Sequence, residues 1–371
     1  MKVLQILPEL NSGGVERGTL EVARRLVADG HEAVVVSNGG RMVAELERRG
    51  ARHVQMPVHR KRLGTLLQVG RLRRLLEAER PDVLHIRSRA PGWVAWLAWR
   101  KIPAATRPRL VSTVHGFYSV NVYSAVMTRG ERVIAVSESV RDYVLKNYPR
   151  VAPERLTVIH RGVAPEEFPR GFTPDAAWLA RWREERPELA GRKTILLPGR
   201  ITRWKGHEDL LRLIAGLRAA GVDAHGVVAG ETHAHKRAFD DELRGLAATL
   251  GVAERVSWLG HRADVREVMA VCDVTCSLSR EPEAFGRVSL EALALGRPVV
   301  GYDHGGVAEQ LRAVFPAGCV ATGDEAALLD RTRALLAGSA GPGPIPREFT
   351  LDAMCGATLA VYRDLLASPR G

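Results

Sequence analysis

The sequence has few cysteines, four in 371 residues. So small a number cannot form a disulfide framework in a chain of this length. Cys272 and Cys276 are the closest pair, and no second pair stands at the spacing of metal ligands. We therefore interpret all four as small buried hydrophobic residues in a reducing compartment, and we expect no metal site.

Long apolar runs are also missing, as the longest stretch without a charged residue shows. The longest, residues 110–128, contains Ser, Thr, His and Asn, which excludes a membrane span. Residues 1–10 hold one lysine and a short apolar run, too little for a secretory signal. With 46% hydrophobic and 26% charged residues, the chain has the composition of a soluble globular protein, and its length favours two domains. We expect a cytoplasmic protein.

Acidic residues are scarce in one region. Residues 41–110 hold 17 Lys or Arg against 5 Asp or Glu, an excess of +12 that equals the net charge of the whole chain. So local an excess predicts attraction to an anionic partner, either nucleic acid or an acidic membrane surface. A basic nucleic-acid-binding protein is the alternative from a different functional class, but no helix-turn-helix, zinc finger or ribonucleoprotein motif is present.

Two segments of this region combine basic and apolar residues. Residues 60–76 mix Arg and Lys with leucines, and Trp93, Trp96 and Trp99 recur every third residue beside Arg100. Basic amphipathic segments of this kind can lie on a bilayer. They can equally be surface helices whose apolar side chains face the core, and the sequence leaves both interpretations open.

Apolar strands alternate with helical periodicity along the whole chain, in two series. This alternation predicts an α/β protein of two doubly wound domains. We place the first domain at 1–170, a Pro- and Trp-rich linker at 171–190 and the second domain at 191–350, followed by a last amphipathic helix within 351–371. The expected strands are 3–7, 33–36, 83–86, 110–114 and 133–136, then 194–197, 226–229, 256–259, 274–278 and 298–301.

In open parallel sheets, ligands bind outside the carboxyl ends of the strands, so the loops that follow strands are the candidate sites. Gly13 and Gly14 follow the first strand and would let a phosphate or sugar approach backbone amides, although a tight turn without a ligand explains them as well. His115 follows the strand at 110–114 and is followed by Gly116, a position that favours an active-site role.

The second domain has the more specific signals. Arg200 and Lys205 follow its first strand near a helix start, where two cations would suit a diphosphate. Glu283 and Glu291 have seven residues between them, and one lies in a loop while the other lies on the helix that Gly286 begins. Carboxylates accept paired hydrogen bonds from sugar hydroxyls, so the pair could hold two sugar rings.

Taken together, these motifs resemble a retaining glycosyltransferase of family 4 with the GT-B fold, over nearly the whole chain. The resemblance implies two facing, Rossmann-like doubly wound domains and a C-terminal helix, 351–371, that crosses back to the first domain. Individually weak, the motifs form a specific ordered set: Gly13-Gly14-Val15-Glu16, Pro81 to His85, His115-Gly116, Val133 to Ser137, Gly199-Arg200, Lys205-Gly206, Leu259-Gly260, Glu283 to Gly286, Glu291, Gly296 to Val300, and Gly305 to Glu309. In one place the chain departs from the family: His160-Arg161 precedes Gly162-Val163 where relatives usually carry Asn.

The resemblance implies a role for each matching residue. Glu283 would contact the transferred sugar and Glu291 the ribose, while Arg200 and Lys205 would neutralise the diphosphate leaving group. His115 would reach the sugar as a fourth catalytic residue. The remaining binding positions would be Gly13 and Gly14 on the diphosphate and acceptor side, His261 and Arg262 at the base, Ala284, Phe285 and Gly286 at sugar hydroxyls, and Val288 near the ribose.

The function expected from this resemblance is retaining, metal-independent hexosyl transfer from a nucleotide sugar, with a UDP-sugar favoured. The basic first domain and the Arg87 to Pro91 segment resemble bacterial enzymes of the lipopolysaccharide core, so we expect a glycolipid acceptor and a peripheral position on the inner face of the cytoplasmic membrane. Phosphatidylinositol or a small soluble glycoside remains an alternative acceptor, and a non-catalytic nucleotide-sugar sensor is a further alternative.

Overall fold

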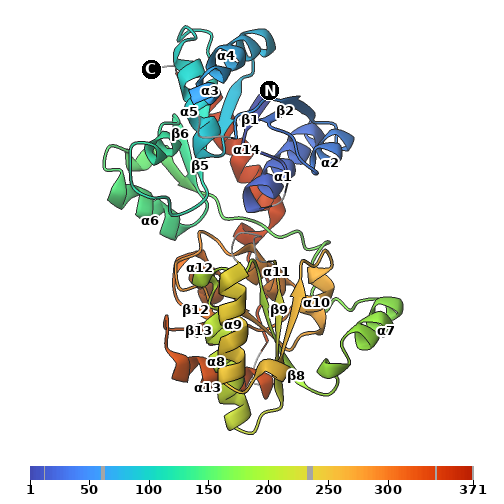
Figure 1. Ribbon diagram of the computed structural model, residues 1–371. Helices are drawn as coiled ribbons and strands as arrows, with labels where there is room; N and C mark the ends of the chain where they lie inside the picture. The colour runs from blue at the N-terminus through green and yellow to red at the C-terminus, as the bar shows by residue number, and fades with distance from the viewer. Residues whose placement is uncertain (12, 60–62, 232–236, 339–340, 370–371) are drawn as a thin grey trace. The chain divides into compact units, whose positions relative to one another are not determined.

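The computed structural model describes residues 1–11, 13–59, 63–231, 237–338 and 341–369. The chain divides into two compact units (Figure 1). Unit 1 consists of Met1–Arg161 and Leu351–Gly371, and unit 2 of Gly162–Thr350. The segment that the sequence suggests as a linker, 171–190, belongs to unit 2, and the C-terminal helix belongs to unit 1.

Unit 1 is built on a parallel sheet with the strand order β3-β2-β1-β4-β5-β6-β7 in its described residues. The central strands are short runs of Val, Ile and Leu that are buried on both faces, as a sheet covered by helices requires. The strands are β1 (Lys2–Ile6), β2 (Glu32–Ser37), β3 (Arg52–Gln55), β4 (Val83–Ile86), β5 (Arg109–Val114), β6 (Arg132–Ala135) and β7 (Leu156–Val158).

Helices connect these strands, and the longer ones bury apolar side chains along one face. In α1, for example, Leu20, Val22 and Leu26 are buried while the arginines between them are more exposed. The helices of unit 1 are α1 (Gly14–Ala28), α2 (Val43–Arg48), α3 (Leu63–Leu66), α4 (Gln68–Glu79), α5 (Arg89–Arg100), α6 (Glu138–Asn147) and α14 (Leu351–Ala367).

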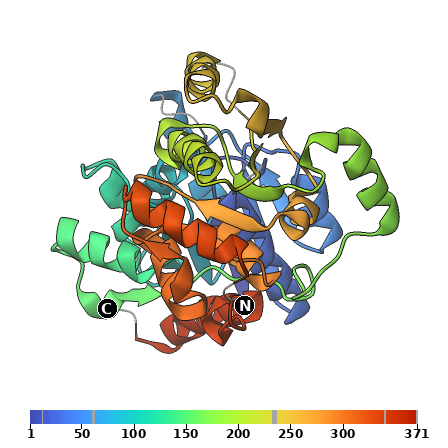
Figure 2. The ribbon, with the colours of Figure 1, turned by 90° about the horizontal axis from the view of Figure 1, so that it is seen from below.

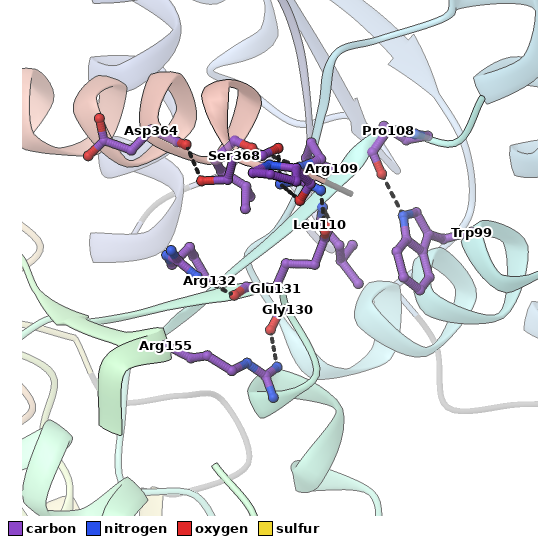
Figure 3. Close-up of polar contacts among 12 residues, drawn as sticks. Trp99, Pro108, Arg109, Leu110, Gly130, Glu131, Arg132, Arg155, Asp364 and Ser368 are labelled. Atoms are coloured by element: carbon purple, nitrogen blue, oxygen red, sulfur yellow. Dashed lines mark hydrogen bonds and ion pairs between the residues drawn. The ribbon is translucent and has the colours of Figure 1, made fainter. Parts of the chain in front are cut away.

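The C-terminal helix α14 is joined to unit 1 by side chains of β5. Figure 3 shows the buried Arg109 at the start of β5, close to the end of α14. Its Nε donates to the carbonyl of Leu365 at 2.8 Å and its Nη2 to that of Ser368 at 3.1 Å. Because carbonyls at a helix C-terminus lack intrahelical partners and carry partial negative charge, a buried guanidinium stabilises this helix end.

Unit 2 repeats the architecture with a parallel sheet in the order β10-β9-β8-β11-β12-β13, again within the described residues. Successive strands run outwards from β8 on one side and from β11 on the other. The point at which the order reverses therefore lies between β8 and β11. The strands are β8 (Lys193–Pro198), β9 (Ala224–Ala229), β10 (Val256–Gly260), β11 (Val274–Ser277), β12 (Val299–Tyr302) and β13 (Cys319–Val320).

Most helices of unit 2 pack on its sheet, but α7 lies at the edge of the unit in both views (Figures 1 and 2). Its Trp178 and Trp182 stack at 5.2 Å between ring centroids, and Trp178 Nε1 donates to Asp264 at 2.8 Å. The helices are α7 (Ala176–Glu185), α8 (His207–Ala219), α9 (Arg237–Thr249), α10 (Val265–Val271), α11 (Arg287–Ala294), α12 (Gly305–Val314) and α13 (Glu325–Leu336).

The amphipathic segments of the basic region face the core with most of their described apolar side chains. Leu72 and Leu76 of α4 are buried, as is Trp99 of α5, whereas Leu67 is 79% exposed. Residues 60–62 lie outside the described part of the chain. In that described part, no helix is both long and apolar enough to cross a membrane.

Candidate active site

At the point where the strand order of unit 2 reverses, two of the candidate site residues from the sequence lie together. Lys205 stands in a short 3-10 turn after β8, and Glu283 lies in the loop after β11. Lys205 Nζ lies 2.7 Å from Glu283 Oε1, and the two side chains are 18% and 17% exposed. The same carboxylate oxygen accepts a hydrogen bond from Ser279 Oγ. A cation and a carboxylate are thus held together at the place where open α/β sheets bind ligands.

Backbone geometry fixes the turn that carries Lys205. Gly206 has φ +74°, and a Cβ there would lie 1.9 Å from the carbonyl oxygen of Leu278 at the end of β11. Only glycine allows this approach, since any other residue would be strained and would overlap the backbone. The loops after β8 and β11 are tied further by Arg280, whose amide donates to the Trp204 carbonyl at 2.7 Å and whose Nε donates to Asp209 at 2.9 Å.

The loop 283–286 is held by the start of α12. The Gly306 amide donates to the carbonyl of Glu283 at 2.8 Å, and a Cβ on Gly305 would lie 2.5 Å from the same oxygen. The buried Gln310 donates through Nε2 to the carbonyl of Phe285 and, at 3.2 Å, to that of Gly286. Among the sequence motifs, the Gly305-Gly306 pair had no role of its own, and no motif pointed to Gln310. The structure makes both of them positioning residues for this loop.

The other predicted donor-side residues lie in several environments. Glu291 is on α11, 6% exposed, and Phe285 is buried against Phe349 with ring centroids 6.1 Å apart. Ala284, Gly286 and Val288 are half-buried near the start of α11. Arg200 is exposed. The close pairing therefore involves Lys205 with Glu283, while Arg200 points to no carboxylate partner among the described residues.

The loop predicted to meet the nucleotide base is partly engaged in unit 2 itself. His261 is exposed. Arg262 forms two hydrogen bonds with Asp264, at 2.8 and 2.6 Å, and its guanidinium lies 5.6 Å from the Trp182 ring centroid. Hydrogen bonds with Arg262 and Trp178 lower the pKa of Asp264 against the opposing effect of its burial. Arg262 therefore links this loop to α7.

In unit 1, the predicted residues also stand at carboxyl ends of strands. Gly13 lies between β1 and α1 with φ +145°, and Gly14 is the first residue of α1. His115 directly follows β5, and its Nδ1 accepts a hydrogen bond from Arg161. Burial lowers the pKa of His115 well below its usual value, and the charges of Arg161 and Arg87 lower it further. The imidazole is therefore neutral at pH 7.

Arg161 occupies the position at which the sequence departs from the family. It is 7% exposed, its Nη2 donates to His115 and its Nη1 lies 3.7 Å from the Met354 sulfur. Arg161 thus forms part of the surroundings of His115. Among the described residues, no group of three or more His, Cys, Asp or Glu side chains is arranged as metal ligands.

Known proteins match both halves of the chain. Residues 12–167 match the family model Glycosyltransferase Family 4, and residues 180–344 match the model Glycosyl transferases group 1. The chain therefore belongs to the glycosyltransferases, with a Family 4 domain followed by a group 1 domain. The recognition of the family from sequence motifs is confirmed to this extent, without a specific assignment to the lipopolysaccharide core.

Among curated relatives, a D-inositol 3-phosphate glycosyltransferase of Stackebrandtia nassauensis is 31% identical over 61% of this chain and 54% of its own length. An alpha-maltose-1-phosphate synthase of Mycobacterium tuberculosis is 29% identical over 70% of each chain. The chain thus spans about half the length of the first relative.

Solved structures support the fold. A glycosyltransferase from Rickettsia africae superposes with a TM-score of 0.86 at 27% identity, over 99% of both chains. Anabaena HepE, solved in complex with UDP and glucose, superposes with a TM-score of 0.78 at 20% identity over 98% of this chain and 99% of its own. The predicted GT-B fold, with two Rossmann-like parallel-sheet domains, is therefore confirmed.

Proposed function

We propose that this protein transfers a hexose from a nucleoside diphosphate sugar to an acceptor hydroxyl, with retention of anomeric configuration. The observation that supports this most directly is the Lys205–Glu283 pair, 2.7 Å apart at the reversal point of the unit 2 sheet. A sugar diphosphate offers hydroxyls that a carboxylate can accept and phosphate oxygens that an ammonium group can bind.

In the proposed reaction, the bond between the anomeric carbon and the diphosphate oxygen breaks, and the acceptor oxygen attacks from the face that the leaving group departs from. The acceptor proton passes to a phosphate oxygen. Lys205 and Arg200 of unit 2 stabilise the negative charge that develops on the diphosphate. His115 of unit 1, which is neutral, can offer a hydrogen bond but no charge. This mechanism is independent of a metal ion.

The test measures nucleoside diphosphate release and glycoside formation from UDP-glucose, UDP-galactose, ADP-glucose and GDP-mannose. A UDP-sugar is the expected donor. UDP at 100 times its dissociation constant would add about 2.7 kcal/mol to the stability of the protein, so thermal shifts rank the nucleotides before any acceptor is known.

The mechanism is tested on the product and on metal dependence. Proton NMR of the product reports the anomeric configuration. Activity should survive EDTA. A requirement for manganese would refute metal-independent transfer, and binding without turnover would favour a sensor.

For the acceptor, we propose a membrane-associated glycolipid such as lipopolysaccharide core, because the basic excess of residues 41–110 suits an anionic surface. The protein would then act as a peripheral protein on the cytoplasmic face of the membrane. The names of the two curated relatives contain inositol phosphate and maltose phosphate, so an acceptor panel should include phosphorylated inositol and soluble sugars.

Vesicle binding tests this placement. Arg71 and Arg74 are exposed on α4 and Arg73 is half-buried there. Replacing all three with Gln should weaken pelleting with anionic vesicles, since each basic residue near such a surface is worth about 1 kcal/mol. The matched control removes the same charge from unit 2 through Arg331, Arg333 and Arg347. Equal pelleting of the two variants would count against docking through this region.

A further inference from the structure

Unit 1 contains a buried arginine that the proposed mechanism does not use. Arg87 directly follows β4 and its side chain is 1% exposed. Its Nη1 donates to Gln5 Oε1 at 3.0 Å, but neither Nε nor Nη2 has a hydrogen-bond partner among the described residues. A buried cation with unpaired donors is costly, so this arrangement needs an explanation other than packing.

The position of Arg87 is built from three elements. Gln5 of β1 is fully buried and donates through Nε2 to the Thr19 carbonyl of α1 at 3.2 Å, which orients the amide oxygen that Arg87 binds. On α1, a Cβ at Gly18 would lie 3.0 Å from Arg87 Nη2 and also 3.0 Å from Arg161 Nη1. The two guanidinium groups therefore approach the same small patch of α1, which only glycine leaves open to both.

A third unpaired donor belongs to His115. Arginine can only donate hydrogen bonds, so His115 Nδ1, which contacts Arg161 Nη2, must be the acceptor. The proton of the neutral ring is then on Nε2, and this atom is buried without a partner among the described residues. All three unpaired atoms, Nε and Nη2 of Arg87 and Nε2 of His115, are thus donors. The group that would satisfy them is an acceptor.

The charges nearby are mixed but leave an excess of cations. Glu16 and Glu21 of α1 interact favourably with the charge of Arg87, and Glu21 forms an ion pair with Arg17 at 3.3 Å. Against these two carboxylates stand Arg17, Arg87 and Arg161. The reversal point of the unit 1 sheet lies between β1 and β4, so Arg87 stands where such a sheet binds ligands, beside the start of α1.

We propose that Arg87 is the anchor of a phosphate-binding site in unit 1, with Arg161 and His115 as neighbours. The identity of the bound phosphate group rests on the proposed function. It is either the diphosphate of the sugar donor or a phosphate group on the acceptor. Three observations define the site: the space that Gly18 leaves for both guanidinium groups, the hydrogen bond that Gln5 accepts from Arg87, and the location at the reversal point of the sheet.

Inorganic phosphate is the probe, measured by calorimetry and thermal unfolding of the full chain against sodium chloride of equal ionic strength. Phosphate should stabilise the wild type. Arg87→Met should bind phosphate ten- to hundredfold more weakly, the loss expected for charge-assisted hydrogen bonds. Without phosphate it should unfold at the same or a higher temperature, because an apolar side chain of similar length replaces an unpaired buried charge. Arg141→Met is the control, since Arg141 is a half-buried arginine of α6 that pairs with Glu138.

A second variant leaves the arginine in place. Gly18→Ala should keep α1 stable, since alanine favours a helix, but its methyl group displaces both guanidinium groups and should weaken phosphate binding. Gly70→Ala on α4, where a Cβ would meet nothing within 4 Å, is the matched control. Unchanged phosphate binding in both Arg87→Met and Gly18→Ala, or a large loss of stability in Arg87→Met without phosphate, would overturn the proposal.

UDP distinguishes the two sources. If the site takes the donor diphosphate, saturating UDP should abolish phosphate binding, and Arg87→Met should weaken UDP binding. If it takes an acceptor phosphate, phosphate should still bind the UDP-saturated protein, and the UDP affinity of the variant should be unchanged. Phosphate binding that depends on Arg87 in a protein that turns over no sugar donor would refute the proposed function alone. Turnover without such binding would refute this inference alone.

Discussion

At the residue scale, the central feature is that Lys205 and Glu283 bind each other at 2.7 Å. Each side chain is less than one fifth exposed, so the pair is screened less than a surface ion pair. A substrate that binds here must replace this contact with contacts of its own. Under the proposed function, the contact holds both side chains in place before the donor binds, which is the preorganisation that electrostatic stabilisation requires.

Lys205→Ala should lower kcat by roughly a hundred- to a thousandfold, the cost of removing one donor from a preorganised anion site. Steady-state kinetics with the donor identified by thermal shift measures it. Arg203→Ala is the control, because Arg203 lies in the same turn but is 65% exposed and pairs with Glu242. A similar loss in both variants would mean that Lys205 acts through general charge only.

Replacing Glu283 and replacing Glu291 should affect UDP binding and turnover differently. Glu291→Gln should weaken UDP binding by roughly ten- to a hundredfold, because a charge-assisted hydrogen bond to a hydroxyl contributes about 1.5 to 3 kcal/mol. Glu283→Gln should reduce turnover of the sugar donor and leave UDP binding nearly unchanged. Calorimetry with UDP decides the matter, with the exposed Glu281→Gln as control. Equal losses of UDP affinity in the two variants would contradict the division of roles.

At the scale of elements, the turn before α8 depends on a close approach to the end of β11. Gly206 and Gly221 have nearly the same φ, +74° and +75°, but a Cβ would overlap Leu278 at Gly206 and meet nothing within 4 Å at Gly221. The two positions therefore separate the cost of left-handed backbone from the cost of a clash.

Gly221→Ala should lower the free energy of unfolding by about 1 kcal/mol through backbone strain. Gly206→Ala should lower it by clearly more and should also weaken UDP binding, because the turn that holds Lys205 must move away from β11. Urea unfolding and calorimetry measure both effects. If the two variants lose the same stability, the contact with the Leu278 carbonyl is not what fixes this turn.

At the scale of the whole molecule, buried histidines make stability depend on pH. Burial lowers the pKa of His207 and of His225 to about 4 in the folded protein. The unfolded chain, with a histidine pKa near 6.5, then binds more protons between about pH 4 and 6.5. Stability is therefore complete above about pH 6.5 and falls as the pH decreases towards 4.

The expected slope is up to about 1.4 kcal/mol per pH unit for each such histidine. Urea unfolding between pH 7.5 and 4.5 measures it, with carboxylates adding to the total at the acidic end. His207→Phe should reduce the slope by the share of one histidine, since His207 is fully buried without hydrogen-bond partners for its ring nitrogens among the described residues. An unchanged slope would show that His207 does not titrate in this range.

The sequence predicted the central strands of both sheets because each is a short apolar run bounded by turn residues. It did not predict the edge strands β3, β7 and β13. β3 reads Arg-His-Val-Gln, and β13 has two residues. An edge strand buries little surface, so its pairing depends on the neighbouring strand rather than on an apolar pattern of its own.

The sequence by itself determined which residues lie at the carboxyl edges of the two sheets, because loops after parallel strands meet at one edge whatever the side chains do. It therefore identified Lys205, Glu283 and His115. Only the tertiary structure decided which side chains touch. The Lys205–Glu283 pair and the hydrogen bonds of Gln310 join segments that are far apart in the chain, and the unpaired donors of Arg87 lie where such segments meet. Such contacts depend on side-chain rotamers and on close packing between elements, which local periodicity does not encode.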